Sequence, residues 1–307
     1  MTAELGPASN GGPQLRTPHV ELSVRQSRLL SFAWRAGVSA FSIVGWALLV
    51  WTMVTLWSGA GFDAHGYREA AKDLLQGVSP YSGTYGDFGA FRYAPPLVVL
   101  FTPAALIPFD AFKVMMLTLN VAALRYAVGS WRWAGLVLVH PWSIHAMYLL
   151  NVNFPIAAAL YAAFRSSTGP LALAGLAKIS PFLAVPQLLR SGRRITPFLL
   201  TMTAAVALTL PVPWLWPAWV TALLTSAAPA GALHVAVGPR VAVAVGLLAI
   251  AWYRRTDWMA ALAAAISIPV LWPSTLVVFL APLRLWVEQM RRPARSQVGC
   301  RDGPLSV

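Results

Sequence analysis

Cysteine and charge are the two things this chain has least of. Its only cysteine is Cys300, in a polar C-terminal stretch, so an intrachain disulfide and a cysteine-based metal site are both excluded. Charged residues make up 11% of the 307 residues, with only ten acidic side chains, whereas a soluble domain carries about 25%. The chain also lacks a glycine-rich phosphate loop, a Walker A sequence and an Asp-x-Asp pair, which argues against a soluble nucleotide-sugar ligand.

Apolar residues dominate what remains. They form 58% of the chain, mean hydropathy is +0.63, and there are 14 tryptophans and 24 prolines. Tryptophan is typical of membrane interfaces and proline of interrupted transmembrane helices. The net charge of +13 does not indicate nucleic acid, because the basic residues cluster at the ends of apolar runs, as in loops that contact anionic lipid. The composition therefore predicts an integral membrane protein.

The apolar runs predict an all-α, polytopic helix bundle of about ten spans, each needing about 20 apolar residues. The expected spans are 36–57, 94–109, 111–128, 134–150, 152–165, 169–189, 195–212, 238–253, 257–272 and 274–290. They form one membrane domain over residues 30–290, with disordered cytoplasmic ends at 1–29 and 291–307. No secretory signal is evident, because the first apolar run is long enough to remain as a span.

Basic residues predict the orientation. With the N-terminus inside and strict alternation, the inner segments hold 15 of the 23 basic residues and the outer segments hold seven, with Lys178 inside a span. The inner set includes Lys113 and the cluster Arg190, Arg193 and Arg194, and the outer set includes Arg125. This bias favours two cytoplasmic termini and puts residues 58–93 outside.

That first outer loop contains four of the ten acidic residues: Asp63, Glu69, Asp73 and Asp87. Apolar residues recur at helical spacing from Asp63 to Gln76, which predicts an amphipathic helix on the membrane surface. Gly77 is placed to end it. A tryptophan-rich stretch at 213–238 predicts a second interfacial or re-entrant segment.

The same loop carries a recognisable order of residues: Asp63-x3-Tyr67, Gly77-x2-Pro80-Tyr81 and Phe91-x-Tyr93-x-Pro95-Pro96. This order resembles the first outer loop of GT-C glycosyltransferases, and most of all glycosyltransferase family 87, the polyprenyl-phosphate-mannose-dependent mannosyltransferases. Two later family elements are present in reduced form. Leu150-Asn151-Val152-Asn153 keeps only the last residue of a Gly-Gln-x-Asn element, and Lys178-Ile179-Ser180-Pro181 keeps the lysine and the final proline of a Lys-Pro-x-Pro element.

The resemblance implies an enzyme of the bacterial plasma membrane that works without a cofactor. It would move a hexose, mannose in this family, from a polyprenyl-phosphate donor to a lipid-linked or glycan acceptor on the outer face. Asp63 matches the family's acidic residue after the first span, which acts as general base on the acceptor hydroxyl. Two other functions stay open: a transporter or flippase for lipid-linked sugars, and an inactive relative that serves as a partner subunit.

Asp63 has a simpler alternative role, because aspartate is also a favoured helix N-cap. Candidates for contact with the donor phosphate or the sugars, each with an alternative structural role, are His65, Arg68, Tyr81, Arg92, Tyr93, Lys178, His234 and Arg240. Lys178 stands out, because it lies within an apolar run. Asn151 and Asn153 are expected at a cytoplasmic turn, in hydrogen bonds between helices. His140 and His145 lack an acidic partner and helical ligand spacing, so no metal site is expected.

Overall fold

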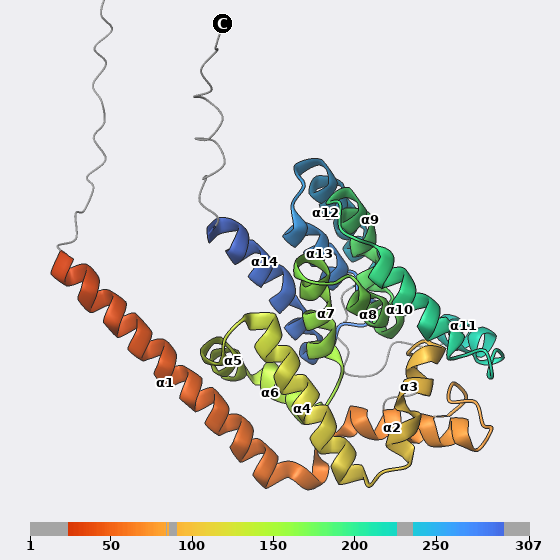
Figure 1. The fold of residues 1–307 in the computed structure, drawn as a ribbon. Coiled ribbons are helices and arrows are strands. Elements are labelled where there is room, and N and C mark those ends of the chain that lie inside the picture. Colours follow the sequence, from red (N-terminus) through yellow and green to blue (C-terminus); the bar gives the residue numbers. More distant parts are fainter. Residues whose placement is uncertain (1–23, 84, 86–90, 226–235, 292–307) are drawn as a thin grey trace, which may run out of the picture.

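The computed structural model describes residues 24–83, 85, 91–225 and 236–291, and every regular element within those ranges is a helix (Figure 1). The first half of the chain contains α1 (Val24–Leu56), η1 (Trp57–Gly59), α2 (Phe62–Leu75), α3 (Pro95–Ala105), α4 (Phe109–Val128), α5 (Trp131–Leu138) and α6 (Pro141–Leu149). The predicted all-α class is confirmed for the described residues. So is the loop helix, which α2 forms before Gly77 in a left-handed conformation.

The second half continues with α7 (Asn153–Arg165), α8 (Gly169–Lys178), η3 (Ser180–Ala184), α9 (Val185–Arg190), α10 (Thr196–Ala207), α11 (Leu215–Thr225), α12 (Val237–Arg254), α13 (Asp257–Ile266), η4 (Pro273–Phe279) and α14 (Leu280–Arg291). Helix α11 falls inside the stretch expected to be interfacial. The last predicted span is a 3₁₀ segment, η4, joined to α14, and the predicted span 169–189 is divided among α8, η3 and α9.

Many helices are shorter than a membrane span. Three of the described helices are long and apolar enough to cross a bilayer, namely α1, α4 and α12, and a fourth span is formed if α6 and α7 are counted together. The α6–α7 pair is bent by 106°. Proline and glycine interrupt the other apolar runs, because proline removes a backbone donor and glycine weakens a helix. The expected count of about ten spans is therefore not confirmed.

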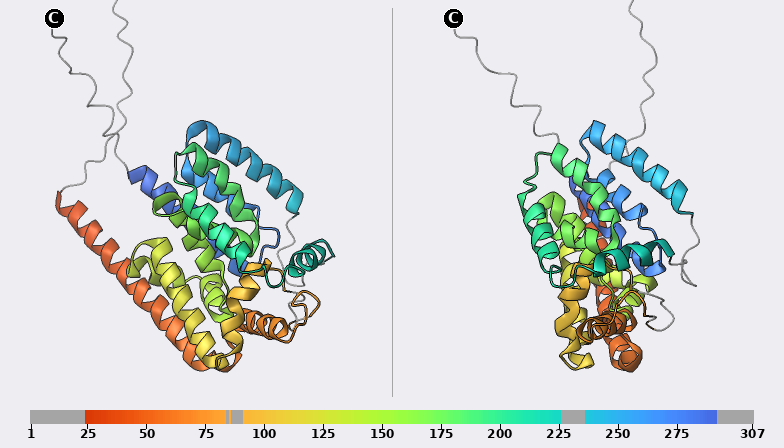
Figure 2. Two further views of the ribbon diagram at one scale, coloured as in Figure 1. Left: turned by 45° about the vertical axis from the view of Figure 1, so that its right-hand side comes forward. Right: turned by 90° about the vertical axis from the view of Figure 1, so that its right-hand side faces the viewer.

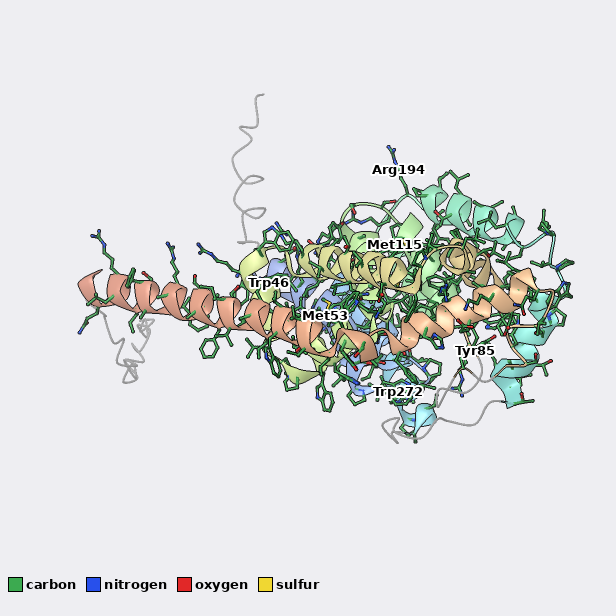
Figure 3. All side chains as sticks on the ribbon, turned by 90° about the horizontal axis from the view of Figure 1, so that it is seen from below. Trp46, Met53, Tyr85, Met115, Arg194 and Trp272 are labelled. Atoms are coloured by element: carbon green, nitrogen blue, oxygen red, sulfur yellow. The ribbon has the colours of Figure 1, made fainter. Side chains whose placement is uncertain are left out.

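Helix α1 packs along the bundle through small residues. Ser42 and Gly45 of α1 face Gly135 of α5, and a Cβ atom added at Gly45 would lie 1.8 Å from the Gly135 carbonyl oxygen. The Trp46 indole then donates to the Trp131 carbonyl oxygen over 3.2 Å. Trp46 and Met53 lie on the length of α1 that runs beside the bundle (Figure 3). Close backbone approach at small residues is the usual way in which membrane helices associate.

The molecule has two chemically different ends, which lie at the bottom and top of Figure 1. The Asp63 end comprises the α1–α2 junction, α2, the start of α4 and the α6–α7 turn. The arginine end comprises the turns after α4, α7, α9 and α12, together with α14, and its exposed or partly exposed basic residues include Arg165, Arg190, Arg193, Arg194, Arg254, Arg255, Arg284 and Arg291. Both further views keep α1 and α4 running between these ends (Figure 2).

Polar contacts hold the arginine end together. The Glu288 carboxylate of α14 accepts from the Arg165 guanidinium of α7 at 2.7 Å and from Arg284 at 2.9 Å. The Tyr161 hydroxyl donates to the same carboxylate over 2.6 Å, and Arg165 also reaches Asp257 of α13. These charge-assisted bonds tie three helices to one another.

The predicted alternation fails at Lys113. The sequence puts Lys113 inside and the end of α1 outside, yet the Lys113 ammonium donates to the Trp57 carbonyl oxygen over 2.9 Å and pairs with Asp110 at 2.8 Å. The reason is that α3 is an 11-residue helix that packs against α2, so the chain returns to the end of α1 before α4 begins. Arg125 and Arg165 consequently lie at the arginine end, opposite to the end that holds Lys113 and Asp63.

Candidate functional site

Asp63 sits in the first turn of α2 and does not cap it. The N-cap is Gly61, which has a φ of +87° and makes no side-chain cap bond. The capping role that the sequence allowed for Asp63 is therefore wrong. A carboxylate in the first turn also benefits from the positive end of the helix dipole. Gly61 suits its position, because a left-handed backbone there would strain other residues.

The junction before Asp63 is fixed from two sides. The Gly61 amide donates to the Tyr148 carbonyl oxygen of α6 over 2.8 Å. Lys113, buried beside the junction, donates to Trp57 and places its ammonium 4.5 Å from the Trp57 ring centroid. A Cβ atom at Gly61 would come within 3.0 Å of the Lys113 chain. These contacts set the direction in which α2, and with it Asp63, leaves α1.

Three chain segments converge on the Asp63 carboxyl group. The Asn151 side chain, in the α6–α7 turn, and the Lys178 ammonium, at the end of α8, both lie close enough to lower the pKa of this carboxyl group, Lys178 through its positive charge and Asn151 as a hydrogen-bonding group. The Asn151 oxygen accepts from the Asn153 amide over 3.0 Å. The Asn151 NH₂ group is therefore the part of the side chain that is available as a donor to Asp63. An acid, an amide and a cation far apart in sequence thus form one polar cluster.

Two tyrosines extend this cluster. Tyr67 follows Asp63 by one helical turn and so lies on the same face of α2, and its hydroxyl is 3.0 Å from the Tyr93 hydroxyl. Tyr67 also meets the backbone of Val152, next to Asn151. Burial raises the pKa of both phenols, and the nearby Asp63 charge adds to the effect. Both therefore remain protonated hydroxyl groups that can donate hydrogen bonds.

The cluster changes the acidity of Asp63. Burial raises the pKa of Asp63 from the ordinary 3.8 to about 7, while Lys178 and the Asn151 hydrogen bond pull it in the opposite direction. Desolvation wins because an ionised carboxylate loses more hydration than these two partners return. Asp63 and Lys178 nevertheless keep part of their surface accessible. A carboxyl group that titrates near neutral pH can both accept and release a proton there.

Backbone strain flanks the cluster. The described residues other than glycine with positive φ are Leu150, Ile179 and Arg255. Leu150 (φ +53°) directly precedes Asn151, and Ile179 (φ +56°) directly follows Lys178. Each such position costs about 1–3 kcal/mol and persists only where surrounding structure imposes it, as at active sites. Two of the three strained positions therefore orient residues that face Asp63.

The backbone of the segment from Arg92 to Ala94 is held by hydrogen bonds to three other parts of the chain. The Arg92 carbonyl oxygen accepts from the Trp219 indole of α11 at 3.0 Å, and the Tyr93 carbonyl oxygen accepts from the Tyr81 hydroxyl at 2.9 Å. The Ala94 amide donates to the Leu176 carbonyl oxygen of α8 over 3.0 Å. Tyr81 and α11 therefore position Tyr93, and the last of these bonds joins its segment to the helix that carries Lys178.

The remaining predicted site residues lie elsewhere or do other work. His65 is exposed and packs edge-on against Phe109, on the far side of α2 from Tyr67. Arg68 donates to the carbonyl oxygens of Ala104 and Ile107, which closes the end of α3. Arg240 is buried and donates to the carbonyl oxygens of Ile268 and Pro269 after α13. His234 lies outside the described residues.

Asn151 is the residue that sequence reasoning misplaced. Strict alternation puts it at a cytoplasmic turn, across the membrane from Asp63, and this separation of the two residues is wrong, because the α6–α7 turn lies beside the Asp63 carboxyl group. Alternation fails here because α5 and α6 are 8 and 9 residues long and together do not form the straight span that was assumed. Two asparagines within an apolar stretch were the available signal, since polar groups inside a membrane segment need a partner.

Comparisons with protein-family models, curated proteins and solved structures find no match to this chain.

Proposed function

We propose that this protein is a polytopic membrane glycosyltransferase that uses a polyprenyl-phosphate-linked hexose, with Asp63 as the general base. One observation carries the proposal: a carboxyl group with a pKa near 7, a lysine and an asparagine meet in a chain that has few charges of any kind. Perturbed acids beside a specific charge partner are typical of functional sites. The resemblance of the first loop to glycosyltransferase family 87 supplies the substrate class, with mannose as the expected sugar.

The proposed reaction uses each member of the cluster. The acceptor hydroxyl oxygen attacks the anomeric carbon of the sugar while its proton passes to the Asp63 carboxylate. The bond between that carbon and the phosphate oxygen breaks, and the polyprenyl phosphate leaves with the electron pair. Lys178 offsets the negative charge that develops on the phosphate. Asn151 positions the carboxylate, and the hydroxyl groups of Tyr67 and Tyr93 offer donors to sugar hydroxyl groups.

The distribution of arginine supports a plasma-membrane location with the Asp63 end outside. The arginine end holds the exposed turns after α9 and α12 and the end of α14, and cytoplasmic segments are enriched in basic residues. Arg125 and Arg165 lie at this end and Lys113 lies at the other, which makes the excess of basic residues at the arginine end larger than strict alternation predicts. In this orientation the site meets a donor and an acceptor in the outer leaflet.

The direct test incubates membranes that contain the protein with radiolabelled polyprenyl-phosphate-mannose. We expect label to move into an acceptor fraction with wild-type membranes and to stay in the donor with Asp63→Ala membranes. The amount of each protein is matched by immunoblot. Membranes from the same host that carry an unrelated transferase serve as the control that the donor and the acceptor are accessible. Equal transfer by both proteins would remove Asp63 from the chemistry.

The pH dependence of transfer provides a second measurement. A general base works when deprotonated, so kcat/KM should rise with pH and reach half its maximum near pH 7. Lys178 lowers the pKa of Asp63, hence Lys178→Met should move this midpoint to higher pH as well as slowing transfer. The matched control is Lys72→Met, which removes a partly exposed lysine that pairs with Glu69 on α2. If the midpoint of the pH profile were unchanged in Lys178→Met, Lys178 would have no electrostatic effect on the pKa of Asp63.

One observation favours a second function, the translocation of lipid-linked sugars. The α6–α7 pair is bent by 106° at the turn that carries Asn151, and transporters often bind substrates at such interrupted helices. Reconstituted proteoliposomes distinguish the two, because a translocator moves the labelled donor across the bilayer without changing it. Movement of unchanged donor with no transfer product would favour this second function.

A further inference from the structure

A groove lies on the molecule away from the Asp63 cluster. Its volume is about 660 Å³, within the size range of ligand sites. Most of its lining is apolar, and it is shared among the α5–α6 link, α13, η4 and α14. The residues used below are Trp142, Trp258, Leu276, Leu283 and Trp286, with His140 and Ser143 as its polar members.

The groove runs from the middle of the molecule toward the arginine end. The inner part of the groove is lined by His140 and Leu276. It lies next to α5, which packs against α1 at Gly45, in the apolar part of α1. Its outer part contains Trp258, in the first turn of α13, and Trp286 of α14. Tryptophan concentrates where hydrocarbon meets headgroups. The apolar inner part and the tryptophans of the outer part therefore follow the order of hydrocarbon and headgroup region in one lipid leaflet.

Positive charge lies beside the outer part of the groove. Arg254 and Arg255 occupy the turn just before Trp258, and Arg291 ends α14 about 7 Å beyond Trp286 by helical rise. All three are exposed. Asp257, the acidic residue nearest to Trp258 in the chain, is already paired with Arg165. An anionic headgroup at this position would thus meet arginines whose side chains face solvent.

We propose that this groove binds one acyl chain of an anionic diacyl phospholipid, such as phosphatidylglycerol, with the headgroup phosphate at Arg254 and Arg255. The acyl chain fills the space between α6, η4 and α14, and Trp258 and Trp286 mark the level of the glycerol. The lipid belongs to the leaflet at the arginine end. It would brace α13 and α14 against α6, the helix whose other end holds the junction before Asp63.

The position of the groove argues against the polyprenyl donor as its occupant. A donor that reacts at Asp63 must hold its phosphate at that end of the molecule, whereas the basic residues beside the groove lie at the other end. A lipid can occupy the apolar groove and contact the arginines at the same time only if its headgroup lies at the arginine end. A diacyl phospholipid of that leaflet satisfies both conditions.

The test measures lipid retained by the purified full-length protein. The protein in detergent is mixed with equal amounts of phosphatidylglycerol and phosphatidylcholine, and native mass spectrometry counts each bound lipid. We expect a preference for phosphatidylglycerol that falls about fivefold for each arginine removed in Arg254→Gln/Arg255→Gln. The control pair is Arg28→Gln/Arg35→Gln, on exposed positions of α1 far from the groove, which should keep the preference.

A second variant tests the groove itself. Leu276→Trp fills it and should lower retention of phosphatidylglycerol about tenfold, because displacing two methylene groups has roughly that effect. Leu200→Trp, at an exposed position on α10, is its matched control, and Leu283→Trp replaces Leu276→Trp if that variant does not fold. Unchanged retention in the filled variant would show non-specific lipid only. Displacement of phosphatidylglycerol by polyprenyl phosphate, blocked by Leu276→Trp, would assign the groove to the polyprenyl chain and overturn the proposal.

Discussion

The Asp63→Asn variant is expected to transfer sugar about 10²–10⁴-fold more slowly than the wild type, the usual contribution of a positioned general base. Asparagine keeps the size of the side chain and its hydrogen-bonding capacity toward Asn151, but it cannot take a proton from the acceptor. Binding of the donor should change little, because Lys178 and the tyrosines remain. Single-turnover transfer with saturating donor measures this loss directly.

Stability separates a catalytic role for Asp63 from a structural one. The pKa of Asp63 is raised in the folded protein, so the folded state binds more protons than the unfolded chain between about pH 4 and pH 7. Its contribution to stability is therefore greatest at low pH and is lost as pH rises through 7. At pH 8, Asp63→Asn should melt at or above the wild-type temperature while transfer is lost. Glu69→Gln, on the same helix, is the control and should keep activity; a lower melting temperature for Asp63→Asn would indicate a structural role.

The second large effect is expected at the α1–α5 contact. In Gly45→Ala the added methyl carbon would overlap the Gly135 carbonyl oxygen, which belongs to the backbone and cannot rotate away. The helices must separate, and the Trp46–Trp131 hydrogen bond would be lost with them. We expect a loss of at least about 3 kcal/mol of stability, at the upper end for overpacking. The melting temperature in detergent reports it.

Gly37→Ala is the matched control on the same helix, because no atom lies within 4 Å of a Cβ at that position. Alanine favours helix over glycine by about 0.5–1 kcal/mol. The control should therefore melt at the same temperature as the wild type or slightly higher. If both variants melted alike, α1 would not depend on this contact for its place in the bundle.

Much of the fold follows from the sequence. Hydrophobic runs located most helices, and the amphipathic pattern after Asp63 predicted α2 to within one residue at each end. Helix lengths were less predictable, because a run such as 134–150 reads as continuous while Pro141 starts a new helix inside it. Alternation assumes that every apolar run crosses the membrane. The short α3 breaks that assumption and brings Lys113 to the same end of the molecule as the end of α1.

The residues of the candidate site could be predicted where the neighbouring sequence alone singles them out, and could not be predicted where their contacts depend on the fold. Asp63 and Lys178 were predicted because each is a charged residue at the edge of or within an apolar run, and Tyr93 was predicted from the residue order of the first loop. The approach of Asn151 to Asp63 was not predicted, since it depends on the bend between α6 and α7. Arg68 and Arg240 looked like phosphate ligands, yet both satisfy backbone carbonyl groups at helix ends. A cation near a predicted membrane surface does not reveal by itself whether its partner is a ligand or the protein.

The positive φ angles of Leu150 and Ile179 have a consequence for how the protein inactivates. Neither residue prefers that geometry, so neighbouring helices must impose it, and the amide of Asn151 and the ammonium of Lys178 are aimed only while those helices stay tightly packed. Gentle heating or a harsher detergent should disrupt the arrangement of the Asn151 amide and the Lys178 ammonium while most of the helical structure is retained. An inactive preparation with a full far-ultraviolet spectrum would then be a loosened protein, not a denatured one.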